Sequence, residues 1–240
     1  MILNMAARGQ EGHIPSSFSI LELVWAIYDG GFVSAKNRNK FVLSKGHGCL
    51  ALYVTLAKKG YFPELWLEDF GSFSSPLGGH PDSTQVPGVE ASTGSLGHGL
   101  PMATGLAYAK KLQGDPGRVY VLVGDGELNE GSMWESALLA AHHQLDNMVT
   151  IVDNNGTSTR AMNMGDIAGK FESFGWDSIE IDGHDIPSIS RALGAATLRP
   201  LVIVANTVKG MGLQEMEGNP AWHHTRISPE DLERFSRELR

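Results

Sequence analysis

The chain has 240 residues, of which 42% are hydrophobic, and its formal net charge is −8 at pH 7. A chain of this length can bury the core of one α/β domain, so we expect residues 1–240 to form a single domain that ends in a helical tail. The negative charge argues against a general nucleic-acid or acidic-membrane binder. No apolar run reaches membrane-spanning length. Cys49 is the only cysteine, which excludes an internal disulfide and favours a reducing, cytoplasmic compartment.

The first half of the chain alternates between apolar helical stripes and short β-branched runs. A helix is predicted over residues 14–30, with its apolar side chains on one stripe, and a short strand over 41–44. A helical run over 50–57 follows, and another helix covers 102–112. Between them, residues 70–87 are rich in Gly, Ser and Pro, and a loop of this length in a compact domain is more often functional than not.

The second half contains one βαβ unit followed by further alternating elements. Residues 119–123 are an apolar run typical of a buried parallel strand, Gly131 leads into a helix, and residues 148–152 form a second strand. The later elements that we predict are helices over 167–174 and 186–193, strands over 176–181 and 200–206, and a C-terminal helix capped by Ser228. This order predicts a doubly wound, mostly parallel sheet in a three-layer α/β/α fold.

Polar residues follow both strands of the βαβ unit. Asp125 comes directly after the first strand, and Asn155 follows the second about thirty residues later. Because a right-handed crossover places both strand ends at one edge of the sheet, we expect the two side chains to converge. A carboxylate, an amide oxygen and nearby loop carbonyls suit Mg²⁺. Gly126 would let a diphosphate approach the backbone near a helix N-terminus. An ordinary βαβ turn with capping Asp and Asn residues is the alternative.

Three further loops place glycine at strand or helix ends. Lys45 and His47 lie at a strand-to-helix junction, where a point charge and a directional donor suit an anion. The glycine-rich loop 94–99 permits close approach of a ligand, although a plain turn explains it equally well. The loop 207–212 combines glycines with another lysine. In a doubly wound sheet, the edge at which such loops meet is the ligand crevice.

Two histidine segments give weaker signals when each is taken alone. His13 precedes a helix N-terminus, and a lone loop histidine is usually only solvated. The adjacent His223 and His224 could ligate a transition metal, but no His, Cys or carboxylate at a recognised spacing accompanies them.

The order of these motifs resembles the thiamin-diphosphate-binding half of transketolase over nearly the whole chain. GDG followed by NN about thirty residues later is similar to the thiamin diphosphate motif. The segments that carry the resemblance are EGHIPSS at 11–17, VLSKGH at 42–47, LGGHP at 77–81, STGSLGHG at 92–99, GDGELNEGSMWE at 124–135, DNNG at 153–156, TVKGMG at 207–212 and WHH at 222–224. Pyruvate-dehydrogenase-type E1 α subunits share GDG and N, but SKGH and the WH segment resemble transketolase better. Deoxyxylulose-phosphate synthase is a closer cousin, and it normally carries its other half on the same chain.

The resemblance implies a thiamin diphosphate-binding fold and an enzyme that uses thiamin diphosphate and Mg²⁺. Mg²⁺ would be held by Asp125, Asn155 and the backbone carbonyl of Thr157. The residues implied to contact the cofactor are Lys45, His47, Gly94, Ser95, Leu96, Gly126, Glu130, Asn155, Lys209 and His223, with Glu130 reaching across a subunit interface. His13, His80 and His223 are implied as the catalytic residues, which surround the donor sugar and move protons near neutrality.

Single-chain transketolases are much longer than this chain. Their second domain supplies the glutamate that protonates the aminopyrimidine ring and the basic residues that hold the sugar phosphate. The resemblance therefore implies the N-terminal subunit of a split transketolase, active only with a separate pyrimidine-binding subunit in an α2β2 assembly. Such an enzyme transfers a two-carbon ketol (glycolaldehyde) unit from a ketose or ketose phosphate to an aldose. Because residues that bind the acceptor would lie on the partner, the sugars and the pathway stay open.

Two positions depart from the single-chain pattern, and two other functions stay open as alternatives. His98 stands where single-chain enzymes often have Gln, and Ser95 where they often have Pro, so the contacts with the aminopyrimidine are open. One alternative is another thiamin diphosphate reaction, such as that of a 2-oxo acid decarboxylase or dehydrogenase E1, or a specialised sugar C–C lyase or ligase. The other is a non-enzymatic homologue that only binds its partner, which predicts a damaged metal site. A dinucleotide-binding Rossmann domain is set aside, because no G-x-G-x-x-G follows the first strand with an acidic residue about 20 positions on.

Overall fold

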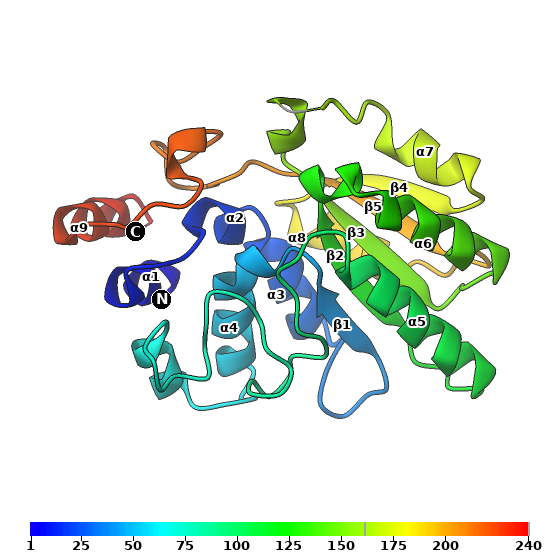
Figure 1. Cartoon of the computed structure of the whole chain (residues 1–240), viewed down its shortest axis with the longest axis horizontal. Helices are drawn as coiled ribbons and strands as arrows, with labels where there is room; N and C mark the ends of the chain where they lie inside the picture. Colours follow the sequence, from blue (N-terminus) through cyan, green and yellow to red (C-terminus); the bar gives the residue numbers. More distant parts are fainter. Residues whose placement is uncertain (161, 240) are drawn as a thin grey trace.

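The centre of the fold is a sheet of five parallel strands (Figure 1). The computed structural model describes residues 1–160 and 162–239 of the chain. The strands are β1 (Lys40–Leu43), β2 (Val119–Gly124), β3 (Met148–Asn154), β4 (Asp177–Asp182) and β5 (Leu201–Asn206). They lie in the order β1-β2-β3-β5-β4, and each neighbouring pair is parallel. The predicted doubly wound parallel sheet is therefore confirmed.

Helices cover both faces of the sheet and make it the middle of three layers (Figure 1). One layer contains α5 (Gly99–Leu112), α6 (Gly131–His142) and α7 (Ile167–Ser173). The other contains α3 (Leu21–Asp29), α4 (Cys49–Lys58) and α8 (Ile186–Leu193). Successive side chains of β2 point to opposite faces. Val121 and Val123 join the core beneath α5, α6 and α7, whereas Tyr120 and Leu122 join the core beneath the other layer.

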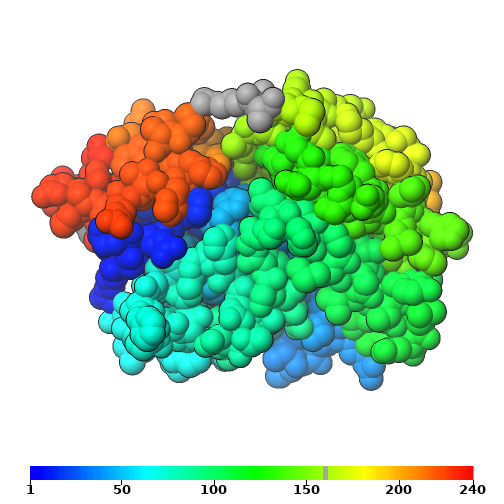
Figure 2. Space-filling view, viewed as in Figure 1, coloured from blue at the N-terminus to red at the C-terminus, as the bar shows by residue number. Residues whose placement is uncertain are grey.

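The remaining helices lie at the two ends of the chain or are short. They are α1 (Ile2–Gly9), α2 (Ile14–Phe18) and α9 (Pro229–Glu238), with the 3₁₀ helices η1 (Gly46–Gly48), η2 (Glu64–Asp69), η3 (Gly126–Asn129), η4 (Thr157–Arg160) and η5 (Pro220–Trp222). α1 and α9 pack together, so the blue N-terminal and red C-terminal segments lie side by side in Figure 2. Across residues 1–160 and 162–239, no helix has both the length and the apolarity needed to cross a membrane.

The N-terminal region differs from the prediction in two respects. The predicted helix over 14–30 is two helices, α2 and α3, because the chain turns at Ile20, whose φ of −120° and ψ of 6° are not helical. Helix α1 was not predicted, although Ile2, Leu3, Met5 and Ala6 have the spacing of one buried face. The C-terminal helix begins as predicted, since Ser228 Oγ accepts a hydrogen bond from the Asp231 N–H at 3.1 Å.

The strand order fixes which loops meet at the carboxyl edge of the sheet. Gly124 of β2, Asp153 of β3 and Ala205 of β5 lie side by side in the ladder. Because these strands run in the same direction, the loops that follow them leave from one edge. In an open parallel sheet, ligands bind at this edge.

We expect the aromatic cluster beneath α7 to contribute strongly to stability. Phe171 is fully buried, and its ring centroid lies 5.3 Å from that of Trp134 and 5.1 Å from that of Trp176. Phe171→Ala should lower the free energy of unfolding by about 3–5 kcal/mol, because it leaves a cavity between two large rings. Phe73 is fully exposed, so Phe73→Ala is the control and should change the same quantity by less than about 0.5 kcal/mol. Urea unfolding measures both, and equal effects of the two substitutions would contradict this packing.

Candidate functional site

One cavity of about 260 Å³ opens at the carboxyl edge of the sheet, beside the ends of β2 and β3. Asp125 lines it from the loop after β2, and Asn155 and Thr157 line it from the loop after β3. Two loops that are distant in sequence therefore converge, as the crossover argument predicted. That these three residues hold a metal stays a prediction.

Asp125 is buried and is held by both loops. Its Oδ1 accepts a hydrogen bond from the Gly126 N–H at 2.7 Å. Its Oδ2 accepts from the N–H of Ser158 at 3.2 Å and from the Ser158 hydroxyl at 3.1 Å. Because Ser158 belongs to the loop after β3, these bonds tie the two loops together and fix the carboxylate at the cavity wall.

The side-chain amide of Asn155 has a fixed orientation. Its Nδ2 donates a hydrogen bond to Asp153 Oδ2 at 2.8 Å. Its Oδ1 accepts from the Thr157 N–H at 3.1 Å and from the Thr157 hydroxyl at 2.5 Å. The oxygen end of the amide therefore lies on the Thr157 side, and the nitrogen end points to Asp153.

These residues fit Mg²⁺ and a diphosphate. Mg²⁺ in proteins is usually held by one or two carboxylates together with phosphate oxygens and waters. Asp125 offers a carboxylate, Asn155 an amide oxygen and Thr157 a backbone carbonyl at the same cavity. Gly126 also lines this cavity, and a Cβ at Gly126 would meet no atom within 4 Å. The glycine thus leaves open space beside the backbone, as a bound diphosphate requires.

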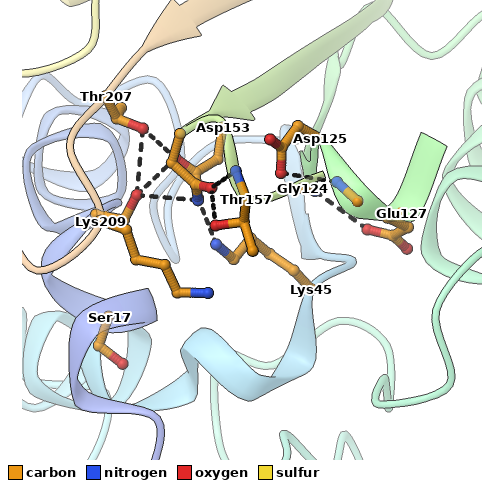
Figure 3. A network of polar contacts seen from close by, with 12 residues as sticks. Ser17, Lys45, Gly124, Asp125, Glu127, Asp153, Thr157, Thr207 and Lys209 are labelled. Atoms are coloured by element: carbon orange, nitrogen blue, oxygen red, sulfur yellow. Dashed lines mark hydrogen bonds and ion pairs between the residues drawn. The ribbon is translucent and has the colours of Figure 1, made fainter. Parts of the chain in front are cut away.

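A buried ion pair lies against the cavity wall (Figure 3). The Lys45 ammonium donates to Asp153 Oδ2, and Lys45 and Asp153 are 2% and 0% exposed. Asp153 Oδ1 accepts from the Ser19 hydroxyl at 2.7 Å and from the Thr207 hydroxyl. Burial acts to raise the pKa of Asp153, but the Lys45 charge and these hydrogen bonds outweigh it and lower the pKa below its usual value. Sequence reasoning identified Lys45 as a site residue and missed Asp153.

Lys209 is the second lysine on the cavity and is nearly buried. Burial, together with the charge of Lys45, lowers its pKa to about 8. Its Nζ lies 2.9 Å from His223 Nδ1. A protonated lysine can only donate, so Nδ1 of His223 accepts, and the proton of the neutral ring lies on Nε2. Burial and the charge of Lys209 also lower the pKa of His223, which favours that neutral ring.

Five histidines from four segments form a cluster around His13. The His13 ring centroid lies 4.6 Å from that of His224, 5.1 Å from His47, 5.2 Å from His223 and 6.5 Å from His80. Burial and the neighbouring basic groups lower the pKa of His13 to about 4 and that of His47 to about 2. The three predicted catalytic histidines therefore lie together, and His224 joins them. Within residues 1–160 and 162–239, no group of three His, Cys, Asp or Glu side chains could hold a metal ion.

Glu127 is a second buried carboxylate that sequence reasoning missed. Its Oε1 accepts from the Ser44 hydroxyl and from the Gly97 N–H at 3.0 Å, and its Oε2 accepts from the Gly124 N–H at 3.3 Å. Burial raises the pKa of Glu127, although these hydrogen bonds oppose the change. Gly97 has a φ of 79°, in the left-handed region that favours glycine. Glu127 therefore holds the glycine-rich loop against the ends of β1 and β2.

The residues implied to contact the aminopyrimidine lie at the rim of the site. Ser95, Leu96 and Glu130 are exposed, and Leu96 also lines the cavity. Gly94 lies against His80, since a Cβ at Gly94 would be 3.0 Å from His80 Cδ2. The rim thus links the cavity to the histidine cluster.

The buried histidines make stability depend on pH. His47 has a folded-state pKa of about 2 against an ordinary value of 6.5, so between these values only the unfolded chain binds the proton. Stability should therefore fall as the pH drops below 6.5. His47→Gln should reduce that slope by up to about 1.4 kcal/mol per pH unit. Urea unfolding between pH 7 and pH 4 measures the slope, with His142→Gln at the exposed end of α6 as the matched control. An unchanged slope for His47→Gln would contradict a neutral, buried His47.

Comparison with known proteins adds three findings to this geometry. The model of the family "transketolase, thiamine diphosphate binding domain" matches residues 6–239. One of the two named subunits of the apulose-4-phosphate transketolase from Actinobacillus succinogenes is 40% identical over 242 residues, which cover 95% of this chain and 88% of that protein. The 6-deoxy-6-sulfo-D-fructose transketolase subunit of Clostridium sp. is 35% identical over 233 residues, which cover 91% of this chain and 85% of that protein.

A solved structure extends the similarity to the fold. Transketolase from Leishmania mexicana matches with a TM-score of 0.87 and 27% sequence identity, over 100% of this chain and 39% of that one. The chain is thus similar along its length to subunits of transketolases and to part of a longer transketolase. These relatives support a transketolase-type enzyme over the alternatives that the sequence left open. The chain, with its cavity between two converging loops, belongs to the transketolase family as a thiamine-diphosphate-binding domain.

Proposed function

We propose that this chain is the diphosphate-binding subunit of a two-chain transketolase. With thiamin diphosphate, Mg²⁺ and a pyrimidine-binding partner subunit, it transfers a two-carbon ketol unit from a ketose or ketose phosphate to an aldose. The observation that carries the proposal is the meeting of Asp125, Asn155 and Thr157 on one cavity, beside two lysines and a histidine cluster. Relatives that are named as separate subunits of a transketolase support the division into two chains.

The cavity walls assign separate tasks to the chain's own groups. Asp125, the Asn155 amide oxygen and the Thr157 carbonyl would hold Mg²⁺, and the open space at Gly126 would receive the diphosphate. Lys209 would face the phosphate charge, which would raise its pKa from about 8 and keep it protonated. Thiamin diphosphate, when bound, supplies the nucleophilic carbon and the electron sink that ketol transfer needs.

The histidine cluster would hold the sugar and move its protons. His13, with a pKa lowered to about 4, is neutral near pH 7 and can accept a proton from a sugar hydroxyl. His223 would donate from Nε2, because Lys209 occupies its Nδ1. His80 lies in the same cluster. Several neutral imidazoles in contact suit a polyhydroxy substrate, whose hydroxyls need both donors and acceptors.

The partner subunit would complete the rim of this site. Ser95, Leu96 and Glu130 are exposed there, and we propose that the pyrimidine-binding subunit covers them in an α2β2 assembly. A cytoplasmic enzyme is consistent with a single, buried cysteine. The two relatives above are named for different sugars, so the proposal covers ketol transfer and leaves the sugar to the assay.

Reconstitution tests the proposed activity directly. The chain and its co-purified partner are mixed with thiamin diphosphate, Mg²⁺, a panel of ketose and ketose-phosphate donors and an aldose acceptor, and products are followed by mass spectrometry. The mixture should lengthen the aldose by two carbons, and either chain alone should not. A complex that binds the cofactor but decarboxylates 2-oxo acids and transfers no ketol unit would contradict the proposal.

Removal of the proposed metal carboxylate gives a sharper prediction. Asp125→Ala should weaken Mg²⁺-dependent binding of thiamin diphosphate to the complex by more than about 100-fold, since even changes behind the metal ligands cost about 10- to 100-fold. Calorimetry with and without Mg²⁺ measures the effect. Glu180→Ala, which removes an exposed carboxylate from edge strand β4, is the matched control and should bind as the unchanged chain does. Binding by Asp125→Ala at the same affinity as this control would exclude Asp125 as a ligand.

A further inference from the structure

The carboxylate of Asp153 is surrounded by donors from four segments of the chain. Oδ1 accepts from the hydroxyls of Ser19 and Thr207, and Oδ2 accepts from Lys45 Nζ and Asn155 Nδ2. The side chain is 0% exposed. Both oxygens are therefore engaged, and the Lys45 charge balances that of the carboxylate. Asp153 is suited to hold its neighbours in place rather than to bind a metal itself.

The contact with Asn155 decides which end of that amide faces the proposed metal. The oxygen and nitrogen ends of an amide have nearly the same shape, so their hydrogen-bond partners fix the orientation. Asn155 Nδ2 lies 2.8 Å from Asp153 Oδ2 and 3.4 Å from Ser19 Oγ. A serine hydroxyl can donate or accept, whereas an ionised carboxylate can only accept. Of these two contacts, only Asp153 therefore requires nitrogen at its side.

The oxygen end of the amide lies on the opposite side from this bond. Asn155 Oδ1 meets the N–H and the hydroxyl of Thr157, and both residues line the cavity that Asp125 lines. If the amide turned over, it would present Nδ2 to the cavity and to the Thr157 N–H, and a nitrogen with two hydrogens cannot ligate a cation. Orientation of this one amide therefore decides whether the site offers its second side-chain oxygen.

We propose that Asp153 is a positioning residue of the metal site, whose carboxylate holds the Asn155 amide with its oxygen toward the cavity. The inference rests on the proposed function, because it assigns the site a divalent cation bridged to a diphosphate. Asp153 keeps Lys45 as its counter-ion, so it orients the amide without adding net charge behind the cation. Partners behind metal ligands commonly act in this way, and their loss costs about 10- to 100-fold in metal affinity.

The test measures Mn²⁺, a substitute for Mg²⁺, by electron paramagnetic resonance on the complex of the full chain and its partner with thiamin diphosphate. Asp153→Ala should weaken Mn²⁺ binding by about 10- to 100-fold, and cofactor binding should recover at saturating Mn²⁺, which a misfolded chain would not show. Thr207→Val removes a donor to the other oxygen of the same carboxylate, and its Mn²⁺ affinity should stay within about twofold of the unchanged chain.

A rescue variant separates orientation from general stability. In Asp153→Ala/Asn155→Asp, both terminal atoms at position 155 are oxygens, so either orientation offers one to the metal. This variant should bind Mn²⁺ more tightly than Asp153→Ala. If Asp153→Ala does not fold because Lys45 is left unpaired, Lys45→Met/Asp153→Ala is compared with Lys45→Met, and the same weakening is expected.

The outcomes distinguish this inference from the proposed function. Binding by Asp153→Ala within about twofold of the unchanged chain, while Asp125→Ala loses binding, would overturn the role of Asp153 and leave the metal site intact. Failure of the rescue variant to bind more tightly than Asp153→Ala would overturn the orienting role as well. If the unchanged complex binds no Mn²⁺ with thiamin diphosphate, the proposed function and this inference both fall.

Discussion

The buried pair of Lys45 and Asp153 organises the carboxyl edge of the sheet. Asp153 ends the buried part of β3, and its carboxylate accepts hydrogen bonds from residues that follow α2, β1, β3 and β5. Loss of one partner from a buried pair typically costs about 3–5 kcal/mol, because the other charge is then left without compensation. Four loops thus depend on one anion, and the cavity keeps its shape only while that anion stays ionised and paired.

A second carboxylate fixes the other side of the same edge. Glu127 holds the loop around Gly97 to the ends of β1 and β2. The pKa of Asp153 is lowered and that of Glu127 is raised, although both side chains are buried. The difference lies in Lys45, which contacts Asp153 directly, whereas Glu127 receives its hydrogen bonds from a hydroxyl and two backbone N–H groups. Between these two anchors, Asp125 is presented to the cavity by short bonds within its own loops.

Sequence reasoning predicted the sheet, most of its helices and the meeting of Asp125 with Asn155. It succeeded there because a strand pattern and the parallel crossover rule place the residue after each strand, whatever its neighbours are. It missed Asp153 and Glu127, because their roles depend on hydroxyls, amides and a cation that arrive from distant segments. One signal was present: a carboxylate at the end of a fully apolar strand must find a partner when buried. The break between α2 and α3 was missed for a similar reason, since the apolar stripe continues through it while Ser19 turns to bond Asp153.

The chain thus combines a metal-binding edge with neutral histidines and leaves an exposed rim for a second subunit. Its central claim is that two loops hold one divalent cation against a diphosphate. The most direct measurement is anomalous diffraction from crystals of the two-chain complex grown with thiamin diphosphate and Mn²⁺. A single Mn²⁺ peak about 2.0–2.2 Å from oxygens of Asp125, Asn155 and Thr157 is expected, as for Mg²⁺ in such sites. A peak among the histidines around His13, or no peak at the carboxyl edge of β2 and β3, would contradict it.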